Sequence, residues 1–235
     1  MPNHVANIVT FRGNEEKINK MLLDIQNETF GPGSISFDKI IPMPPELNIE
    51  SGSKSMAGLR LYRDFMDIYS LGHFLSKEEM LAVPDEIEEK YMHIRPDIDK
   101  DTWDLGKKAF QNIVKYGAPD WYDWRTNHWN TKWDAYGYTE NTDYSQCDKL
   151  AFMTAWQEPA PVIQQLSEMY PEVEITHRWA EEQYGHYCGT AKYLGGRQTE
   201  NELMPENSRS EEFALDLWHQ LNTNGTPMDQ GQTMQ

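Results

Sequence analysis

Hydrophobic and polar side chains alternate at the start of the chain and then recur at helical spacing. Residues 4–11 place Val5 and Phe11 on one side, as in a strand. Residues 15–27 repeat apolar side chains every three or four positions, which predicts an amphipathic helix. A second strand is predicted at 35–41, because a run of prolines ends the apolar stretch there. The opening is therefore predicted to be β-α-β.

The second half of the chain repeats this order. Alternating side chains predict strands at 150–156, 173–179 and 187–194, and helical spacing at 162–169 predicts a helix between the first two. Two β-α-β units in tandem can pair into one antiparallel sheet with both helices on one face. The strand at 187–194 would extend this sheet as a hairpin, and residues 210–221 would form a final helix. We therefore predict an α+β fold, a ferredoxin-like split β-α-β antiparallel sheet with a C-terminal helix.

A mostly helical insertion separates the two halves. Residues 46–118 repeat apolar side chains at helical spacing, and Asp and Glu are frequent around 78–104. The last residues are polar and lack periodicity, which is typical of disorder. We predict a discontinuous ferredoxin-like core formed by residues 1–45 and 119–222. The acidic helical insertion is predicted at 46–118 and the disordered tail at 223–235.

The charge balance limits the classes of partner. The chain has 21 Lys and Arg against 38 Asp and Glu, a net charge of −17. Because phosphate contacts supply most non-specific affinity for nucleic acids, DNA and RNA should be repelled. In one interpretation the acidic residues keep the protein soluble. In the other, the acidic surface imitates the phosphate backbone of DNA and occupies a DNA-binding partner. No run approaches the ~20 apolar residues of a membrane span, and the start lacks a signal-peptide pattern, so we expect a cytoplasmic protein without membrane contact.

Aromatic residues concentrate between residues 121 and 138, in the stretch WYDWRTNHWNTKWDAYGY. It holds four of the eight tryptophans. Trp and Tyr are frequent at interface hot spots, so the segment is a candidate binding surface. In the alternative interpretation the tryptophans plug the end of the sheet where the insertion rejoins it. The candidate binding residues are Trp121, Trp124, His128, Trp129, Lys132, Trp133, Asp134 and Tyr136.

Few residues suggest catalysis or metal binding. His177, His186 and Cys188 could bind zinc across the predicted hairpin, but we favour the interpretation that they are satisfied core side chains. Cys147 has acidic neighbours that would raise its thiol pKa and reduce its reactivity. His128 has aspartates nearby in the sequence but is interpreted as a polar spacer rather than an acid–base group. We therefore predict no catalytic residue, no metal and no cofactor.

Four segments together resemble a known family. In chain order they are NHVANIVTFRG, FDKIIPMPPEL, WNTKWDAY and FMTAWQEPAPVI. Their combination is similar to the YubB-type ferredoxin-like proteins carried by bacteriophages and plasmids, over residues 4–195 apart from the insertion. The position of Asn130 is usually glycine in that pattern. The resemblance implies a ferredoxin-like fold and a mobile-element origin, and it implies no reaction or ligand.

These observations favour a binding protein over an enzyme. We expect a non-enzymatic accessory protein of a phage or plasmid that binds a host protein in the bacterial cytoplasm. A role against host defence is the extension that this setting suggests. The alternative is an enzyme or small-ligand-binding protein with a pocket beside residues 121–138. The sequence leaves the oligomeric state open, including association through a sheet edge.

Overall fold

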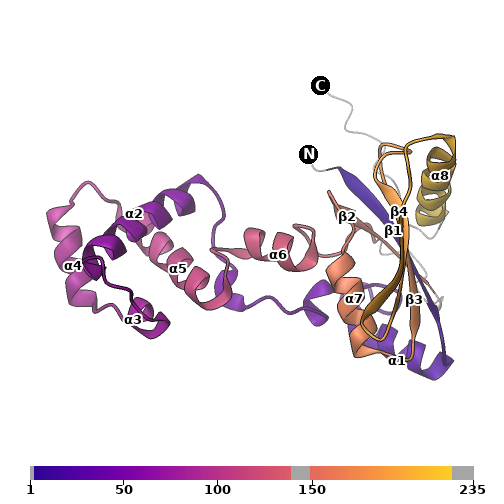
Figure 1. The fold of residues 1–235 in the computed structure, drawn as a ribbon, viewed down its shortest axis with the longest axis horizontal. Coiled ribbons are helices and arrows are strands. Elements are labelled where there is room, and N and C mark those ends of the chain that lie inside the picture. The colour runs from indigo at the N-terminus through magenta and orange to yellow at the C-terminus, as the bar shows by residue number, and fades with distance from the viewer. Residues whose placement is uncertain (1–2, 139–148, 224–235) are drawn as a thin grey trace. The chain divides into compact units, whose positions relative to one another are not determined.

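The computed structural model describes residues 3–138 and 149–223, and the chain divides into two compact units. The first, the sheet unit, combines residues 1–42 and 128–235. The second, the helical unit, comprises residues 43–127. Figure 1 shows the elements of both units.

The sheet unit is built on one antiparallel sheet with the strand order β2-β1-β3-β4-β5. β1 is antiparallel to both β2 and β3, so those two outer neighbours run parallel to each other. The connection from β2 to β3 is a helix, which makes a split β-α-β unit with β1 inserted between its strands. This arrangement confirms the predicted α+β ferredoxin-like fold, with both halves of the chain in one sheet. The strands are β1 (His4–Arg12), β2 (Lys149–Ala155), β3 (Glu174–Glu181), β4 (Cys188–Leu194) and β5 (Arg197–Leu203).

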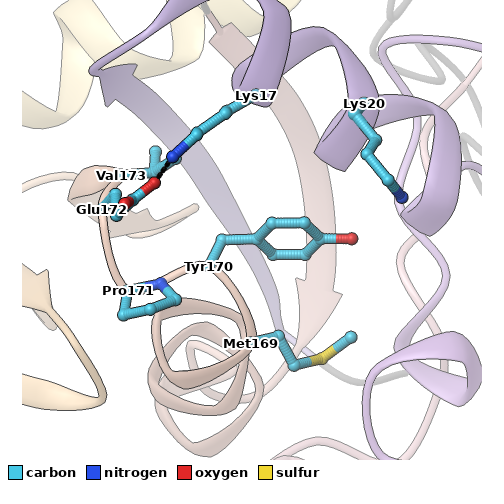
Figure 2. A pocket seen from close by; sticks show the side chains of 7 residues that line it. All are labelled: Lys17, Lys20, Met169, Tyr170, Pro171, Glu172 and Val173. Carbon is cyan, nitrogen blue, oxygen red and sulfur yellow. Dashed lines mark ion pairs between the residues drawn. The ribbon is translucent and has the colours of Figure 1, made fainter.

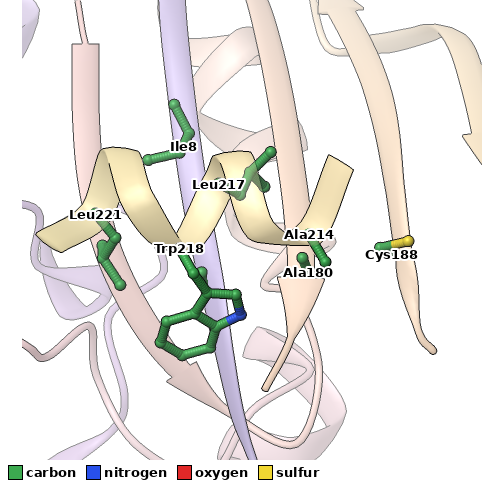
Figure 3. Packing of buried hydrophobic residues seen from close by; sticks show 8 residues of the cluster. Ile8, Ala180, Cys188, Ala214, Leu217, Trp218 and Leu221 are labelled. Atoms are coloured by element: carbon green, nitrogen blue, oxygen red, sulfur yellow. The ribbon is translucent and has the colours of Figure 1, made fainter. Parts of the chain in front are cut away.

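Helices cover both faces of this sheet. α1 (Glu15–Ile25) and α7 (Ala160–Met169) lie on one side, and α8 (Ser208–Thr223) lies on the other (Figure 1). Figure 3 shows Leu217, Trp218 and Leu221 of α8 directed at the sheet, where they pack with a buried cluster that includes Ile8. The indole N–H of Trp218 donates to the Glu181 carbonyl at 3.1 Å. The C-terminal helix is therefore an integral layer of the sheet unit.

The predicted strand at 35–41 is wrong. Phe37–Lys39 forms a short 3-10 helix, η1, and the Ile40 N–H donates to the Phe37 carbonyl at 3.0 Å. The Phe37 N–H donates to the Asp134 carboxylate at 2.7 Å instead of to a neighbouring strand. Phe37 is nevertheless fully buried. The apolar pattern therefore identified core positions but gave the wrong backbone conformation.

Strand β5 was not predicted from the sequence. All seven of its residues, RQTENEL, are exposed, so no apolar alternation marks them. The strand forms because Gly195 and Gly196 both adopt positive φ, as a tight hairpin turn requires, and direct the chain back along β4. An ion pair between Lys192 and Glu200 (2.8 Å) joins the two strands. β5 therefore extends the sheet at its edge.

The helical unit is organised around aromatic side chains. Its core contains Tyr62, Phe65 and Trp103, whose rings lie 5.1–5.5 Å apart between centroids. α2 and α5 cross in direct backbone contact at Gly58 and Gly106, where a Cβ on either residue would overlap the other helix. The elements are η2 (Pro45–Leu47), α2 (Ser53–Ser70), α3 (Lys77–Leu81), α4 (Asp85–Ile94), α5 (Lys100–Tyr116) and most of α6 (Trp121–Trp129).

The division between the units differs from the predicted domain boundaries. The predicted insertion, 46–118, lies within the helical unit, but residues 119–127 also belong to that unit. Asn112 of α5 donates to the Pro119 carbonyl at 3.0 Å, which fastens the chain to α5 beyond the predicted boundary. No helix among the described residues is long and apolar enough to cross a bilayer. Of the predicted tail, residues 224–235 lie outside the described residues.

Candidate functional site

Trp129, one of the candidate binding residues, is a core residue of the sheet unit. Its side chain is 0% exposed, and its indole N–H donates to the Ile41 carbonyl at 2.9 Å. Its ring meets Phe37 edge to face, with 5.8 Å between centroids. Trp129 therefore holds the chain that follows η1, and a partner cannot reach it.

The next two residues fasten the aromatic segment to the end of β2. Asn130 has a φ of +64°, in the left-handed region that glycine and asparagine adopt most readily. Asparagine at this position is therefore compatible with the turn that the chain makes here. The Asn130 amide donates to the Glu158 carbonyl at 2.8 Å. Thr131 Oγ1 donates to the Ala155 carbonyl and accepts from the Ala155 N–H, at 2.9 and 3.1 Å.

Asp134 and Tyr136 also support the fold. The Asp134 carboxylate accepts from Ser36 Oγ at 2.9 Å as well as from the backbone of η1, so it closes the loop where the predicted strand fails. The backbone of Tyr136 pairs with Met153, and its hydroxyl donates to the Thr154 carbonyl at 3.1 Å. Burial raises the pKa of the Tyr136 hydroxyl. These two candidates are therefore engaged within the protein.

Lys132, Trp133 and Trp156 form the exposed part of this region, which we call the Lys–Trp platform. The Lys132 ammonium lies 3.9 Å from the centre of the Trp133 ring and 4.7 Å from that of Trp156. The two tryptophans remain 37% and 39% exposed. A lysine over an exposed aromatic ring contributes about 0.5–1 kcal/mol. The contacts order three side chains into one apolar surface with a single positive charge.

Trp156 reaches the platform through a strained backbone. Its φ is +72°, a conformation that costs a bulky residue about 1–3 kcal/mol and persists only where the surroundings impose it. Its N–H donates to the Asn3 carbonyl at 2.9 Å, so this backbone is anchored. Trp156 was not predicted as a site residue, because the alternating pattern of residues 150–156 assigns it to one face of a strand. Only its place in the segment FMTAWQEPAPVI singled it out.

A half-buried carboxylate, that of Glu158, supports the turn that follows Trp156. The Tyr187 hydroxyl donates to the Glu158 carboxylate, and Asn130 holds the carbonyl of the same residue. Burial raises the pKa of the Glu158 carboxyl, against the opposing effect of the Tyr187 hydrogen bond. The turn is therefore sensitive to the ionisation of one acid.

This ionisation predicts a pH dependence of stability. A carboxyl with a raised folded-state pKa binds more protons than the unfolded chain, so its burial penalty falls as the pH drops from 7 towards 4.5, its ordinary pKa. Glu158→Gln removes this contribution. Urea unfolding measures the difference in the free energy of unfolding between the variant and wild type. This difference should favour the variant more at pH 7 than at pH 5. An equal difference at both pH values would contradict the assignment.

The remaining aromatic candidates are distributed differently. Trp121 and Trp124 belong to the helical unit. Trp124 is 5% exposed, and the Arg125 guanidinium lies 5.4 Å from the centre of the Trp121 ring. His128 is half-buried on α6 and is the first residue of the second segment of the sheet unit. The predicted set of eight therefore contributes only Lys132 and Trp133 to the platform.

The three candidate zinc ligands do not converge. Cys188 lies in the buried cluster under α8 (Figure 3), whereas His177 lies on the other face of the sheet. His186 is exposed before β4, with Nδ1 3.0 Å from Glu206 Oε1. Within the described ranges, no three His, Cys, Asp or Glu side chains gather into a metal site. Cys147 lies outside those ranges.

His177 instead belongs to a buried polar network across three strands. The Asn7 amide donates to Thr154 Oγ1 at 2.9 Å, so its oxygen accepts from His177 Nε2, also at 2.9 Å. Nε2 therefore carries the ring proton. Burial lowers the pKa of His177 to about 3, which keeps the imidazole neutral at ordinary pH. The network joins β1, β2 and β3 and contacts no solvent.

A pocket of about 210 Å³ opens at the opposite end of the sheet from the platform. Lys17 and Lys20 of α1 line it together with residues 169–173. Figure 2 shows the ring of Tyr170 among these side chains. Lys17 pairs with Glu172, and Lys20 pairs with Asp24, which also accepts from the Tyr170 hydroxyl. The charges around this pocket are therefore neutralised within the protein.

A larger pocket, about 440 Å³, lies between α4 and α5 of the helical unit. Its lining includes Trp103 and Lys107. Lys107 pairs with the buried Glu88 at 2.9 Å and with Asp85 at 3.3 Å. The Tyr62 hydroxyl donates to Glu88 at 2.8 Å. These contacts stabilise the helix packing, and neither pocket is lined by the platform residues.

Comparison with known proteins agrees with the fold. Residues 128–220 match the family model described as a ferredoxin-like domain in Api92-like protein. No curated protein matches the chain. A crystal structure of a protein api92 from Yersinia pseudotuberculosis aligns with a TM-score of 0.41 and 12% identity, over 88% of this chain and 99% of that chain. The family-model match over residues 128–220 supports the ferredoxin-like fold, and its description names no reaction, ligand or partner.

Proposed function

We propose that this protein is a non-enzymatic accessory protein of a phage or plasmid that binds a host protein through the Lys–Trp platform. It would act in the host cytoplasm, against host defence. One observation carries the proposal: Trp133 and Trp156 remain exposed around the ordered ammonium of Lys132 at the end of the sheet.

The geometry of the platform favours protein binding. Interface hot spots are enriched in tryptophan, and a rigid side chain loses little conformational entropy on association. Lys132 is already ordered by its two ring contacts. The strained backbone of Trp156 is a second sign, because strain of this kind clusters at functional positions. The platform is therefore preorganised for a partner.

The charge distribution indicates the sign of the partner. The sheet unit contains 22 acidic and 10 basic residues, a net charge of −12, whereas the helical unit contains 16 and 11, a net of −5. Oppositely charged proteins associate faster because their fields steer the encounter. We therefore expect a partner with a basic surface that meets the sheet unit.

The described chemistry favours binding over catalysis. The Asp134 carboxylate accepts a hydrogen bond from the backbone, and His177 is buried and neutral in its hydrogen-bonded network. His186 pairs with Glu206. The two pockets described above are lined by residues outside 121–138, so neither of them is the small-ligand site of the alternative. A shared apolar surface is the stronger feature of this region.

Retention of a host protein tests the proposal. Trp133→Ala and Trp156→Gly should each weaken retention on the tagged chain at least tenfold, while the thermal midpoint stays within a few degrees, since both side chains are partly exposed. Leu215→Ala is the control, because Leu215 is 49% exposed on α8 of the same unit. Affinity purification from host cells at low salt, with quantitative mass spectrometry, makes the measurement. Equal retention by all variants, or no reproducible partner, would refute the proposal.

A further inference from the structure

A second exposed apolar surface lies on the helical unit, at the end of α2 and in the loop that joins α2 to α3 (Figure 1). It consists of Ile68, Leu71 and Phe74, whose exposed fractions are 59%, 82% and 106%. We call these three residues the apolar tip. Phe65, one turn earlier on α2, is buried in the core. Tyr69 and Leu75, which neighbour the tip in the sequence, pack against that core, so the tip residues are exposed at the edge of a packed region.

The backbone of the tip is also unfavourable for its sequence. Leu71 caps α2 in the left-handed conformation, with φ +49° and ψ +31°, and its N–H donates to the Ile68 carbonyl at 3.2 Å. Glycine usually occupies this position at a helix end because it has no Cβ, and asparagine sometimes does because its short polar side chain can hydrogen-bond locally. Stability alone would favour glycine at 71 and a polar residue at 74. Leucine and phenylalanine call for a contact outside the unit.

We propose that the apolar tip docks into a concave apolar pocket, with a basic rim, on a partner protein. Three large apolar side chains on a turn form a convex surface that such a pocket can surround. Exposed carboxylates flank the tip in the sequence, at Asp64 and Asp67 before it and at Glu78 and Glu79 after it. Arg63 and Lys77 offset only half of these charges, so a basic rim complements the surface.

Two other occupants fit the tip less well. Contact between the tips of two copies would bury only three side chains on each, short of the roughly 1,200–2,000 Å² of a stable interface. It would also bring like-charged flanks together. A membrane surface attracts basic segments, whereas these flanks carry a net negative charge. Both occupants are nevertheless outcomes of the test.

Photo-crosslinking identifies the occupant. The probe is p-benzoylphenylalanine placed at Phe74 of the full chain in host cells. The control position is Met56, which is 56% exposed near the other end of the same helix. We expect one discrete product with one host protein at position 74, lost in Leu71→Gly, and no such product at position 56. The same product at both positions, or none, would overturn the proposal.

Measurements on purified components complete the test. The host protein captured at position 74 should bind wild type at least tenfold more tightly than Leu71→Gly, and more weakly at 300 mM than at 50 mM salt. Leu71→Gly should keep or raise the thermal midpoint, because it relieves the left-handed strain. A crosslinked dimer of this chain, sedimentation with vesicles of phosphatidylcholine and phosphatidylglycerol, or equal affinities would overturn the proposal. Trp133→Ala leaves the tip intact, so this proposal and the platform can fail separately.

Discussion

Replacing Trp129 by alanine is expected to lower the free energy of unfolding of the sheet unit by about 4 kcal/mol. The side chain is fully buried against Phe37, so its removal leaves a cavity in the core. The Ile41 carbonyl would also lose the indole N–H that it accepts at 2.9 Å. Urea unfolding followed by far-ultraviolet circular dichroism measures the change.

Trp133→Ala is the matched control for this prediction. Trp133 lies four residues further along the same segment but is 37% exposed, so its removal should cost about 1 kcal/mol or less. Equal losses in the two variants would show that the segment does not divide into a buried and an exposed part. That result would remove the structural basis of the platform.

Replacing Gly106 by alanine is expected to lower the free energy of unfolding of the helical unit by about 3 kcal/mol. Alanine is intrinsically the better helix former, by about 1 kcal/mol. That gain is outweighed because a Cβ at Gly106 would overlap backbone atoms of Gly58, which cannot move without separating α2 from α5. Denaturant unfolding and hydrogen exchange of α2 and α5 measure the effect.

Ala57→Gly is the control for Gly106→Ala, because it measures the effect of helix propensity alone in the same pair of helices. Ala57 is exposed on α2, next to the crossing residue Gly58, so its replacement should cost only about 1 kcal/mol. A Gly106→Ala variant as stable as wild type would mean that the two helices do not touch at these glycines. The packing of the helical unit would then need a different description.

The sequence predicted those elements that bury apolar side chains. α1, α7 and α8 show clear helical periodicity because each buries one face, whereas β1 is buried on both faces and shows a run of mostly apolar side chains. β5 escaped prediction because all its residues are exposed and its formation depends on the turn before it. The segment at 35–41 was misassigned because Asp134, a residue distant in the sequence, holds its backbone.

The candidate site was only partly predictable for a related reason. Composition identified the aromatic segment, and the resemblance drew attention to WNTKWDAY. Neither could tell that Trp129 points into the core while Trp133 stays exposed, since that choice depends on tertiary contacts. Trp156 was missed because its position follows from a left-handed φ of +72°, which no alternation pattern encodes.

The proposed function depends most on whether Trp133 and Trp156 together bind a partner. The direct measurement is isothermal titration calorimetry of the purified host partner with the double variant Trp133→Ala/Trp156→Gly, alongside Leu215→Ala. A folded double variant whose Kd is raised at least ~100-fold, with an unchanged Kd for the control, is the predicted result. A folded double variant that binds as tightly as wild type would contradict it.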